Sequence, residues 1–269
     1  MSTTIIFHTH VRNVSLLPVA ARNLQSFRDH NPGPDTIIMP VHHQQCASRL
    51  NPTGDNLHLP DSTEINVNQP GIPSDGNLWG YLDRFILQWF SDHGRHFKWD
   101  RFIWAEWDCY CNTPLSQFYK DVWHQPLACA GIKLWPQDQR RWQWWNGDDE
   151  SRKGKPWNWE VNQWANHPMQ FHPRFVELSS YLCGVPPCAG LMFRRDVLER
   201  ISELSIDPLF DGLFDEMRLG TMARYAGFQP RLIRPDIDKF ISWKGRKPTG
   251  PGIWHKVTEA VCKETNLDT

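Results

Sequence analysis

The sequence predicts an α/β protein built on a mostly parallel sheet. Two observations lead to this prediction. An apolar strand, an amphipathic helix and a second apolar strand follow one another within the first 41 residues, and a further apolar strand at residues 101–105 ends in acidic residues. A strand–helix–strand unit of this length is typical of parallel pairing, because the helix carries the chain back to the start of the sheet. The 269 residues are enough for a single domain with a substantial core.

The first elements are defined by apolar runs and by turn residues. Residues 3–7 are β-branched or apolar and predict a buried first strand, followed by a loop at 8–12. Residues 16–30 predict a helix, and the Asn-Pro-Gly-Pro run at 31–34 ends it. Its apolar face consists of Leu17, Ala20, Ala21, Leu24 and Phe27. Residues 35–41 predict the second strand.

The middle of the chain begins with a long polar stretch at residues 44–77, which predicts a loop. Residues 78–93 then predict a helix with apolar residues spaced for one face, and residues 101–105 predict the next strand. A short helix is expected at 114–122. In the last third we expect a glycine-containing strand at 186–193, helices at 194–201 and 215–226, a strand at 231–233 and a short helix at 257–262. Gly227 is expected to end the second of these helices in a left-handed conformation.

Composition excludes several classes of protein. The formal net charge of −1 argues against a nucleic-acid binder that works by bulk electrostatics. No apolar run approaches the roughly 20 residues that a membrane-spanning helix needs. The N-terminus lacks the basic and apolar regions of a signal peptide, so we expect a cytoplasmic protein. The seven cysteines contain no CxxC pair and are expected to be buried free thiols.

Tryptophan is unusually frequent, with 15 residues in the chain. Many of them fall between residues 135 and 164, including Trp144 and Trp145. Indole rings stack on the apolar faces of sugars and anchor binding sites, but they also fill the core of loop-rich regions. Both interpretations of this tryptophan-rich segment remain open.

The acidic pair Glu106 and Asp108 follows the predicted strand at 101–105. Side chains two positions apart at a strand end point to the same side, and open α/β sheets bind ligands at the carboxyl ends of their strands. Two carboxylates there can hold Mg²⁺ or Mn²⁺, which can neutralise a diphosphate leaving group. An isolated acid-x-acid triplet is usually a solvated loop, but its position after an apolar strand favours a functional role.

This strand-acid-x-acid pattern, followed by Cys-Asn-Thr-Pro-Leu at 111–115, resembles the DxD region of the GT-A nucleotide-sugar glycosyltransferases. The resemblance implies a GT-A, Rossmann-like fold: a mixed, mostly parallel sheet flanked by helices. It implies one catalytic domain over 1–269 with a tryptophan-rich insertion, its nucleotide-binding half at 1–125 and its acceptor-binding half at 126–269. Glu106 stands where the family has its first aspartate. The second acid is the usual direct ligand, so the resemblance favours Asp108.

Three later stretches are similar to the same family. The stretch at 187–196 resembles the small-residue strand that forms the sugar floor, with Ala189 and Gly190 as substrate contacts; a tight strand crossing is the alternative explanation. The stretch at 214–221 resembles the helix start that supplies the base, here Asp215 or Glu216, although acids also favour a helix N-terminus for its dipole alone.

The third stretch, Gly-Ile-Trp-His-Lys at 252–256, resembles the C-terminal loop of the family. There His255 would complete the metal site and Lys256 would contact the diphosphate. The same resemblance assigns the nucleotide pocket to residues after the first strand and on the helix before the metal strand. These residues are His8, Thr9, Arg12, Asp83 and Arg84.

The sequence therefore predicts a metal-dependent, inverting glycosyltransferase. It would use Mn²⁺ or Mg²⁺ and a nucleotide-sugar donor, with a UDP-sugar favoured, and a carbohydrate or other hydroxyl acceptor. Asp215 or Glu216 would deprotonate the acceptor, and Trp144 and Trp145 would contact substrate. Two alternatives remain: a non-catalytic carbohydrate-binding protein that uses the tryptophan cluster, and a metal-dependent nucleotidyltransferase or hydrolase.

Overall fold

The computed structural model describes part of the chain. The described residues are 3–9, 11, 14–33, 35–43, 63–65, 82–134, 175–186, 189–210, 213, 215–242, 245 and 247–258, with the side chains of 43, 63–65, 175 and 176 excepted. The predicted loop at 44–77, the tryptophan-rich segment and the expected helix at 257–262 therefore fall largely or wholly outside the described residues.

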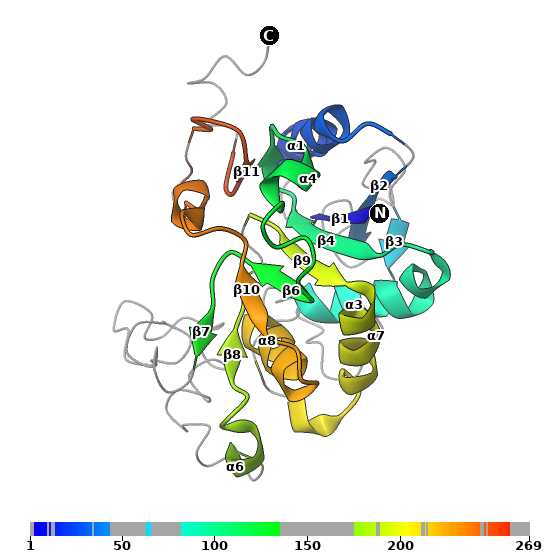
Figure 1. Cartoon of the computed structure of the whole chain (residues 1–269). Helices are drawn as coiled ribbons and strands as arrows, with labels where there is room; N and C mark the ends of the chain where they lie inside the picture. The colour runs from blue at the N-terminus through cyan, green and yellow to red at the C-terminus, as the bar shows by residue number, and fades with distance from the viewer. Residues whose placement is uncertain are drawn as a thin grey trace, which may run out of the picture.

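A seven-stranded sheet forms the centre of the described structure (Figure 1). Its strands are β1 (Thr3–Thr9), β2 (Thr36–His43), β3 (Thr63–Ile65), β4 (Arg101–Glu106), β6 (Leu127–Cys129), β9 (Leu191–Arg194) and β10 (Pro230–Leu232). They lie in the order β10-β6-β9-β4-β1-β2-β3. The helices are α1 (Leu17–His30), α3 (Leu82–Asp92), α4 (Leu115–Phe118), α6 (Phe175–Leu178), α7 (Arg195–Leu204) and α8 (Asp215–Tyr225).

The sheet is mixed and mostly parallel, and helices flank it, which confirms the predicted α/β class. Strands β3, β2, β1 and β4 pair in parallel, and β10 pairs in parallel with β6. Only β9, among the described strands of this sheet, runs antiparallel to both of its neighbours, β4 and β6. The central strands β1 and β4 are buried along their whole length, as expected where helices cover both faces.

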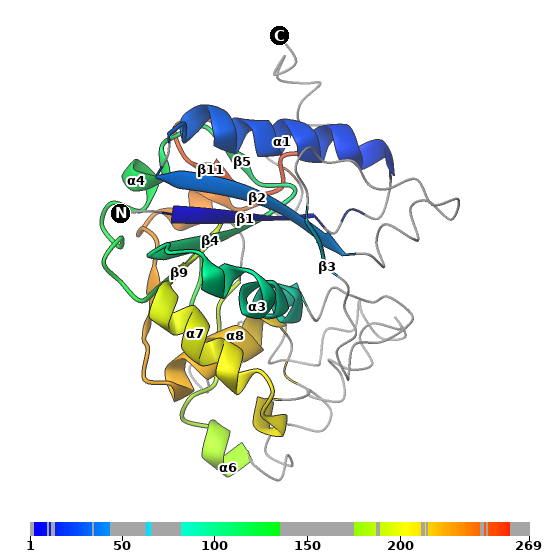
Figure 2. The same cartoon turned by 90° about the vertical axis from the view of Figure 1, so that its right-hand side faces the viewer.

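Helix α1 covers one face of the sheet, whereas α3, α7 and α8 lie on the other (Figure 2). On the α1 side, Leu24 and Phe27 pack against Ile5, Phe7 and Ile103. On the opposite side, α3 is strongly amphipathic, and its buried residues join side chains of β4, β9, α7 and α8 in one cluster. This second cluster includes Phe85, Ile86, Trp89, Phe90, Trp104, Phe193, Val197 and Met222.

Two short antiparallel pairs stand beside the main sheet. Strand β5 (Tyr110–Cys111) pairs with β11 (Ile253–Trp254), and β7 (Lys133–Leu134) pairs with β8 (Cys183–Gly184). Sequence patterns did not predict these pairs or β6, because each strand has only two or three residues and no measurable alternation. The β5–β11 pair matters most for the site, since it joins the middle of the chain to its C-terminal part.

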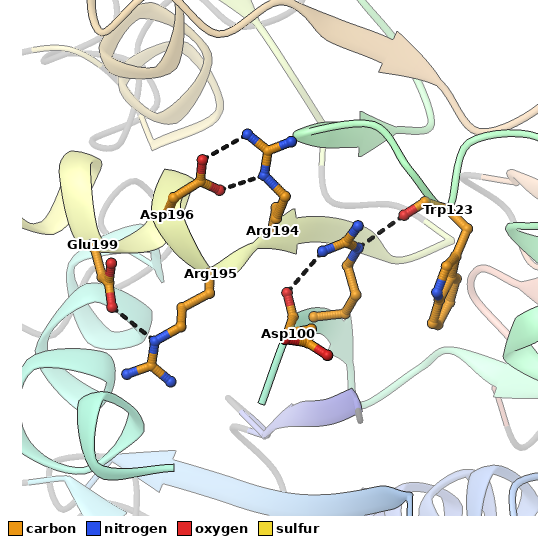
Figure 3. Close-up of polar contacts among 7 residues, drawn as sticks. Asp100, Trp123, Arg194, Arg195, Asp196 and Glu199 are labelled. Carbon is orange, nitrogen blue, oxygen red and sulfur yellow. Dashed lines mark hydrogen bonds and ion pairs between the residues drawn. The ribbon is translucent and has the colours of Figure 1, made fainter. Parts of the chain in front are cut away.

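Arginine side chains cluster where β4 begins, at the opposite end of this strand from Glu106. Figure 3 shows Arg194 and Arg195 of this cluster with their partners. Because β9 is antiparallel, Arg194 at its end lies opposite Arg101 at the start of β4. Arg194 forms a bidentate pair with Asp196 at 2.5 and 2.6 Å, and Arg101 donates to the Trp123 carbonyl at 2.8 Å. Arg194 and Arg195, which follow Ala189 and Gly190 in sequence, therefore lie at the opposite end of the sheet from Glu106.

Several smaller predictions are also tested. Gly227 follows α8 with φ +89°, as expected for a left-handed end. Cys109, Cys111, Cys129 and Cys183 are buried thiols that form no disulfide, and burial raises the pKa of Cys111 to about 11. Among the described residues, no helix is both long enough and apolar enough to cross a membrane.

Candidate metal centre and active site

The acidic residues lie at a sharp turn where β4 ends. Glu106 is the last residue of β4, and the Cys109 amide donates to the Glu106 carbonyl at 2.9 Å to close the turn. Asp108 lies within this turn, and both acids are about 92% buried, with relative exposures of 8%. Buried carboxylates are rare unless they are paired or bind a cation. The acidic turn, residues 106–108, therefore requires a partner.

That partner comes from the C-terminal strap, defined as residues 250–257. The strap is held to the region after the acidic turn by the β5–β11 pair and by a hydrogen bond of 2.8 Å from the Val257 amide to the Asp108 carbonyl. A further hydrogen bond from the His255 amide to the Phe240 carbonyl fixes its other side. Gly252 is required there, because a Cβ atom would collide with the Phe240 ring.

The strap places His255 against both acids, as the sequence predicts for a metal site. Its Nε2 atom lies 3.8 Å from Glu106 Oε2 and 3.9 Å from Asp108 Oδ1. One ligand atom from each of the three residues lies within 4.8 Å of the others. An octahedral ion with ligand distances of about 2.1 Å separates adjacent ligands by roughly 3.0 Å and opposite ligands by roughly 4.2 Å. The two distances from His255 lie between these values.

The chemistry of the three residues also fits a divalent cation. Two carboxylates and one imidazole form a donor set that suits Mn²⁺ or Mg²⁺. Asp108 Oδ1 is buried and has no hydrogen-bond donor among the described residues, which leaves its lone pairs directed at the centre. Among the described residues this is the only group of three or more such side chains close enough to share an ion.

Burial sets the protonation of these groups in the absence of an ion. Burial, followed by the charges of Asp108 and Glu216, raises the pKa of Glu106 well above its ordinary value. Burial also raises the pKa of Asp108, although His255 and Lys256 act in the opposite direction. Burial lowers the pKa of His255, which favours the neutral imidazole that binds metals. The centre is therefore short of positive charge.

Lys256 lies beside the centre in a conformation that few residues adopt. Its φ of +64° is in the left-handed region, which costs a residue with a side chain about 1–2 kcal/mol. The hydrogen bond of the next residue, Val257, to the acidic turn holds it there. The Lys256 charge opposes the raised pKa values of both Glu106 and Asp108, so its ammonium is near enough to act on both acids.

The two predicted catalytic acids at the start of α8 face different neighbours. The charge of Glu216 contributes to the raised pKa of Glu106, so the two carboxyl groups are near enough to interact electrostatically. The pKa of Asp215 is also raised well above its ordinary value, by burial first and then by Glu216 and Asp83. Of the two, Glu216 is the one whose charge acts on the acidic turn.

Asp83 is occupied by a buried ion pair. Its two carboxylate oxygens accept hydrogen bonds of 2.5 and 2.6 Å from Arg218 on α8, and Arg218 also donates to the Leu213 carbonyl at 2.9 Å. Both side chains are at most 1% exposed. This pair braces α8 against α3, which explains Asp83 without a nucleotide. The neighbouring Arg84 is buried on α3, and its contact with a nucleotide stays a prediction.

The remaining predicted residues divide into placed and unplaced ones. His8 lies directly opposite Glu106 in the β1–β4 register, and its ring packs 5.9 Å from the Trp104 ring. Thr9 is buried at the end of β1. Both residues therefore lie at the same end of the sheet as Glu106, and their contact with a nucleotide stays a prediction. Arg12, Trp144 and Trp145 lie outside the described residues.

Ala189 and Gly190 precede β9 beside the end of β4, with φ values of +58° and +87°. They lie at the same end of the sheet as Glu106, because Leu191, the next residue, is opposite Trp104. However, a Cβ atom on Gly190 would collide with the Tyr119 hydroxyl. Packing against Tyr119 therefore accounts for the glycine, although Tyr119 follows α4 and is not on a crossing strand. Substrate contact at these two residues stays a prediction.

Asn23 and Tyr119 take part in this region but were missed by sequence reasoning. Asn23 is fully buried on α1, where its side chain bonds to the acidic turn and to the strap. A signal was present in the sequence. Asn23 falls on the face that carries Ala20, Leu24 and Phe27, and a polar side chain on an apolar face must find partners.

Comparisons with known proteins found similar structures but no sequence match. No protein-family model matches this sequence, and no curated protein matches it significantly. Among solved structures, the chain is similar to a galactosyltransferase, LgtC, crystallised in complex with donor and acceptor sugar analogs. The two share 10% sequence identity over 96% of this chain and 88% of that chain, with a TM-score of 0.41.

Proposed function

We propose that this protein is a metal-dependent glycosyltransferase of the GT-A type, which moves a sugar from a nucleotide-diphosphate donor to a hydroxyl acceptor. The observation that carries the proposal is the convergence of Glu106, Asp108 and His255, three buried ligands from segments far apart in the chain. The proposal includes a nucleotide-binding half at 1–125 and an acceptor-binding half at 126–269.

Glu106, Asp108 and His255 are the residues that would hold Mn²⁺ or Mg²⁺. A divalent ion bound there would supply positive charge to stabilise the diphosphate as it leaves. Lys256 adds a fixed positive charge on the same side, which suits a phosphate oxygen. The nucleotide itself would lie over the ends of β1 and β4, near His8 and Thr9, where open α/β sheets bind ligands.

Glu216 is the proposed general base. In the transfer, the acceptor oxygen forms a bond to the anomeric carbon while the bond from that carbon to the diphosphate oxygen breaks. The diphosphate leaves with the electron pair, and the acceptor proton passes to the Glu216 carboxylate. A single displacement of this kind inverts the anomeric configuration. Glu216 is favoured over Asp215 because its charge acts on Glu106, whereas Asp215 interacts electrostatically with the Asp83–Arg218 pair.

The test is transfer and hydrolysis of a panel of nucleotide sugars, UDP-sugars first, with added Mn²⁺ and a mixture of hydroxyl acceptors. The Asp108→Asn variant should lose at least about 100-fold in kcat/KM, because it removes a charged metal ligand. Asp196→Asn is the matched control, since Asp196 is a half-exposed acid at the opposite edge of the sheet (Figure 3). Full activity in Asp108→Asn would refute the metal role.

Product analysis separates this reaction from a related one. A glycosyltransferase releases the nucleoside diphosphate and links the sugar to the acceptor. A nucleotidyltransferase or pyrophosphohydrolase would instead release sugar phosphate, and that product would refute the proposal.

A further inference from the structure

Asn23 joins the two segments that carry the proposed metal ligands. Its side-chain nitrogen donates to the Trp107 carbonyl at 3.0 Å and to the Val257 carbonyl at 3.2 Å. Trp107 lies within the acidic turn between Glu106 and Asp108, and Val257 ends the strap that carries His255. These partners lie 84 and 234 residues away in sequence. One amide group on helix α1 therefore spans the two sides of the centre.

The side-chain chemistry suits this role closely. An amide NH₂ offers two donors on one nitrogen, so it can hold two carbonyl oxygens at once. Arg22 donates to Asn23 Oδ1 at 2.9 Å, which fixes the amide with its nitrogen toward the two carbonyls. Asn23 has no exposed surface, so water cannot replace these bonds without opening the packing.

The two Asn23 hydrogen bonds add to direct contacts between the acidic turn and the strap. The Val257 amide bonds to the Asp108 carbonyl, and the same residue's carbonyl accepts from Asn23. Val257 is thus held on both of its peptide groups, directly after Lys256. Because the imidazole of His255 is only two residues earlier, this anchoring limits how far its Nε2 can move from the two carboxylates.

We infer that Asn23 is a positioning residue for the proposed metal centre: its amide sets the separation of the acidic turn and the C-terminal strap. The inference rests on the proposed function for the presence of a metal, and on the hydrogen bonds for the coupling. Residues that orient metal ligands from behind typically change metal affinity about 10–100-fold when they are replaced.

The test uses the full chain with Mn²⁺ alone as the probe. In Asn23→Asp, two donors become an acceptor that faces two carbonyl oxygens, while the shape is retained. Asn23→Ala is the second variant, which removes the amide without adding charge. Asn31→Asp is the matched control. It makes the same change at the residue that follows α1, where the side-chain amide donates to the Phe27 carbonyl of that helix. Circular dichroism and thermal melting show that each variant is folded.

Two measurements then separate the possible failures. Titration of Mn²⁺, followed by the loss of the electron paramagnetic resonance signal of the free ion, should show at least about tenfold weaker binding in both Asn23 variants. Hydrogen exchange should rise at the Val257 amide in these variants and stay at the wild-type level in Asn31→Asp. If Asn23 were a purely structural residue, its variants would lower thermal stability, but their Mn²⁺ affinity and their exchange at Val257 would match those of Asn31→Asp.

Each result bears on a different part of the proposal. Unchanged exchange at Val257, or wild-type Mn²⁺ affinity in folded Asn23 variants, would overturn the positioning role. Failure of the wild-type chain to bind Mn²⁺ or Mg²⁺ would refute the metal centre of the proposed function. In that case the exchange measurement still decides whether Asn23 couples the two segments.

Discussion

Neutralising one ligand of the proposed centre should make the metal-free protein more stable. The ligand atoms of Glu106, Asp108 and His255 lie within 4.8 Å of one another in a buried site. When the pH is high enough to ionise both acids despite their raised pKa values, two carboxylate charges at 4.8 Å repel by about 3.5 kcal/mol at the effective dielectric constant of ~20 that reproduces protein data. Lys256 offsets part of this repulsion. We therefore expect Asp108→Asn to gain about 1–2 kcal/mol without metal, a common size for changes that relieve a functional site.

The assay is thermal unfolding in EDTA and in excess Mn²⁺. At about 2–4 °C per kcal/mol, the Tm of Asp108→Asn should exceed that of the wild type by roughly 2–8 °C in EDTA. Mn²⁺ at 100 times its Kd should stabilise only the wild type, by about 2.7 kcal/mol, and so reverse the order. Asp196→Asn should follow the wild type in both conditions.

The pH dependence of this gain has a definite sign. Folding raises the pKa values of Glu106 and Asp108, so the metal-free folded chain binds protons more tightly than the unfolded chain does. The stability from these groups is present below their unfolded pKa values and is lost as pH rises through the folded ones. The gain from Asp108→Asn should therefore grow with rising pH. His255 acts differently, because its lowered pKa makes stability fall as pH drops below about 6.5.

A clear outcome would refute this reasoning. If Asp108→Asn unfolds at a lower temperature than the wild type in EDTA at about pH 8, the acids do not repel in the folded state. The same conclusion follows if Mn²⁺ raises the Tm of both proteins equally, because the ion would then bind elsewhere.

Three further predictions concern the surroundings of the centre. Arg218→Met should lower the free energy of unfolding, measured in urea, by about 3–5 kcal/mol, since it leaves the buried Asp83 charge unpaired. The double variant with Asp83→Leu should recover most of this loss. A loss below about 1 kcal/mol in Arg218→Met would show that the pair does not brace α8. Gly190→Ala should destabilise the protein by about 1–3 kcal/mol in the same assay, through its positive φ and its collision with Tyr119. Adding Tyr119→Phe should recover part of that loss, because the Tyr119 hydroxyl has no hydrogen-bond partner among the described residues. No recovery in the double variant would contradict the proposed contact. Mn²⁺ binding should release protons, and its affinity should increase from about pH 6 to pH 8. Calorimetry in buffers of different ionisation enthalpy measures the protons released. Binding without proton release would mean that both acids are already ionised in the metal-free protein.

The sequence was informative where structure depends on local pattern. Residues 3–7, 16–30, 35–41 and 101–105 fall in β1, α1, β2 and β4, because apolar runs and a helical face carry that information within one element. The antiparallel direction of β9 was not predictable in this way. It depends on which strands Leu191–Arg194 meets, and β4 and β6 are distant in sequence.

The candidate site shows the same division. Glu106 and Asp108 were identifiable because an acid-x-acid pair after an apolar strand is a local signal, and His255 because it falls in a recognisable loop. Asp83 was assigned to the nucleotide, whereas the structure pairs it with Arg218, 135 residues away. Nothing near Asp83 in the sequence indicates that partner. Contacts of this kind depend on the packing of α3 against α8.

The strap also determines when the centre can exist during synthesis. Gly252 bonds to Asn112 across 140 residues, so a ribosome adding about 5–20 residues per second would need roughly 7–28 s to reach the strap after the acidic turn has been made. During that interval the nascent chain holds both acids but neither His255 nor Lys256. An unfinished chain therefore lacks the third ligand of the proposed metal centre, and that centre can form only when synthesis of the strap is complete.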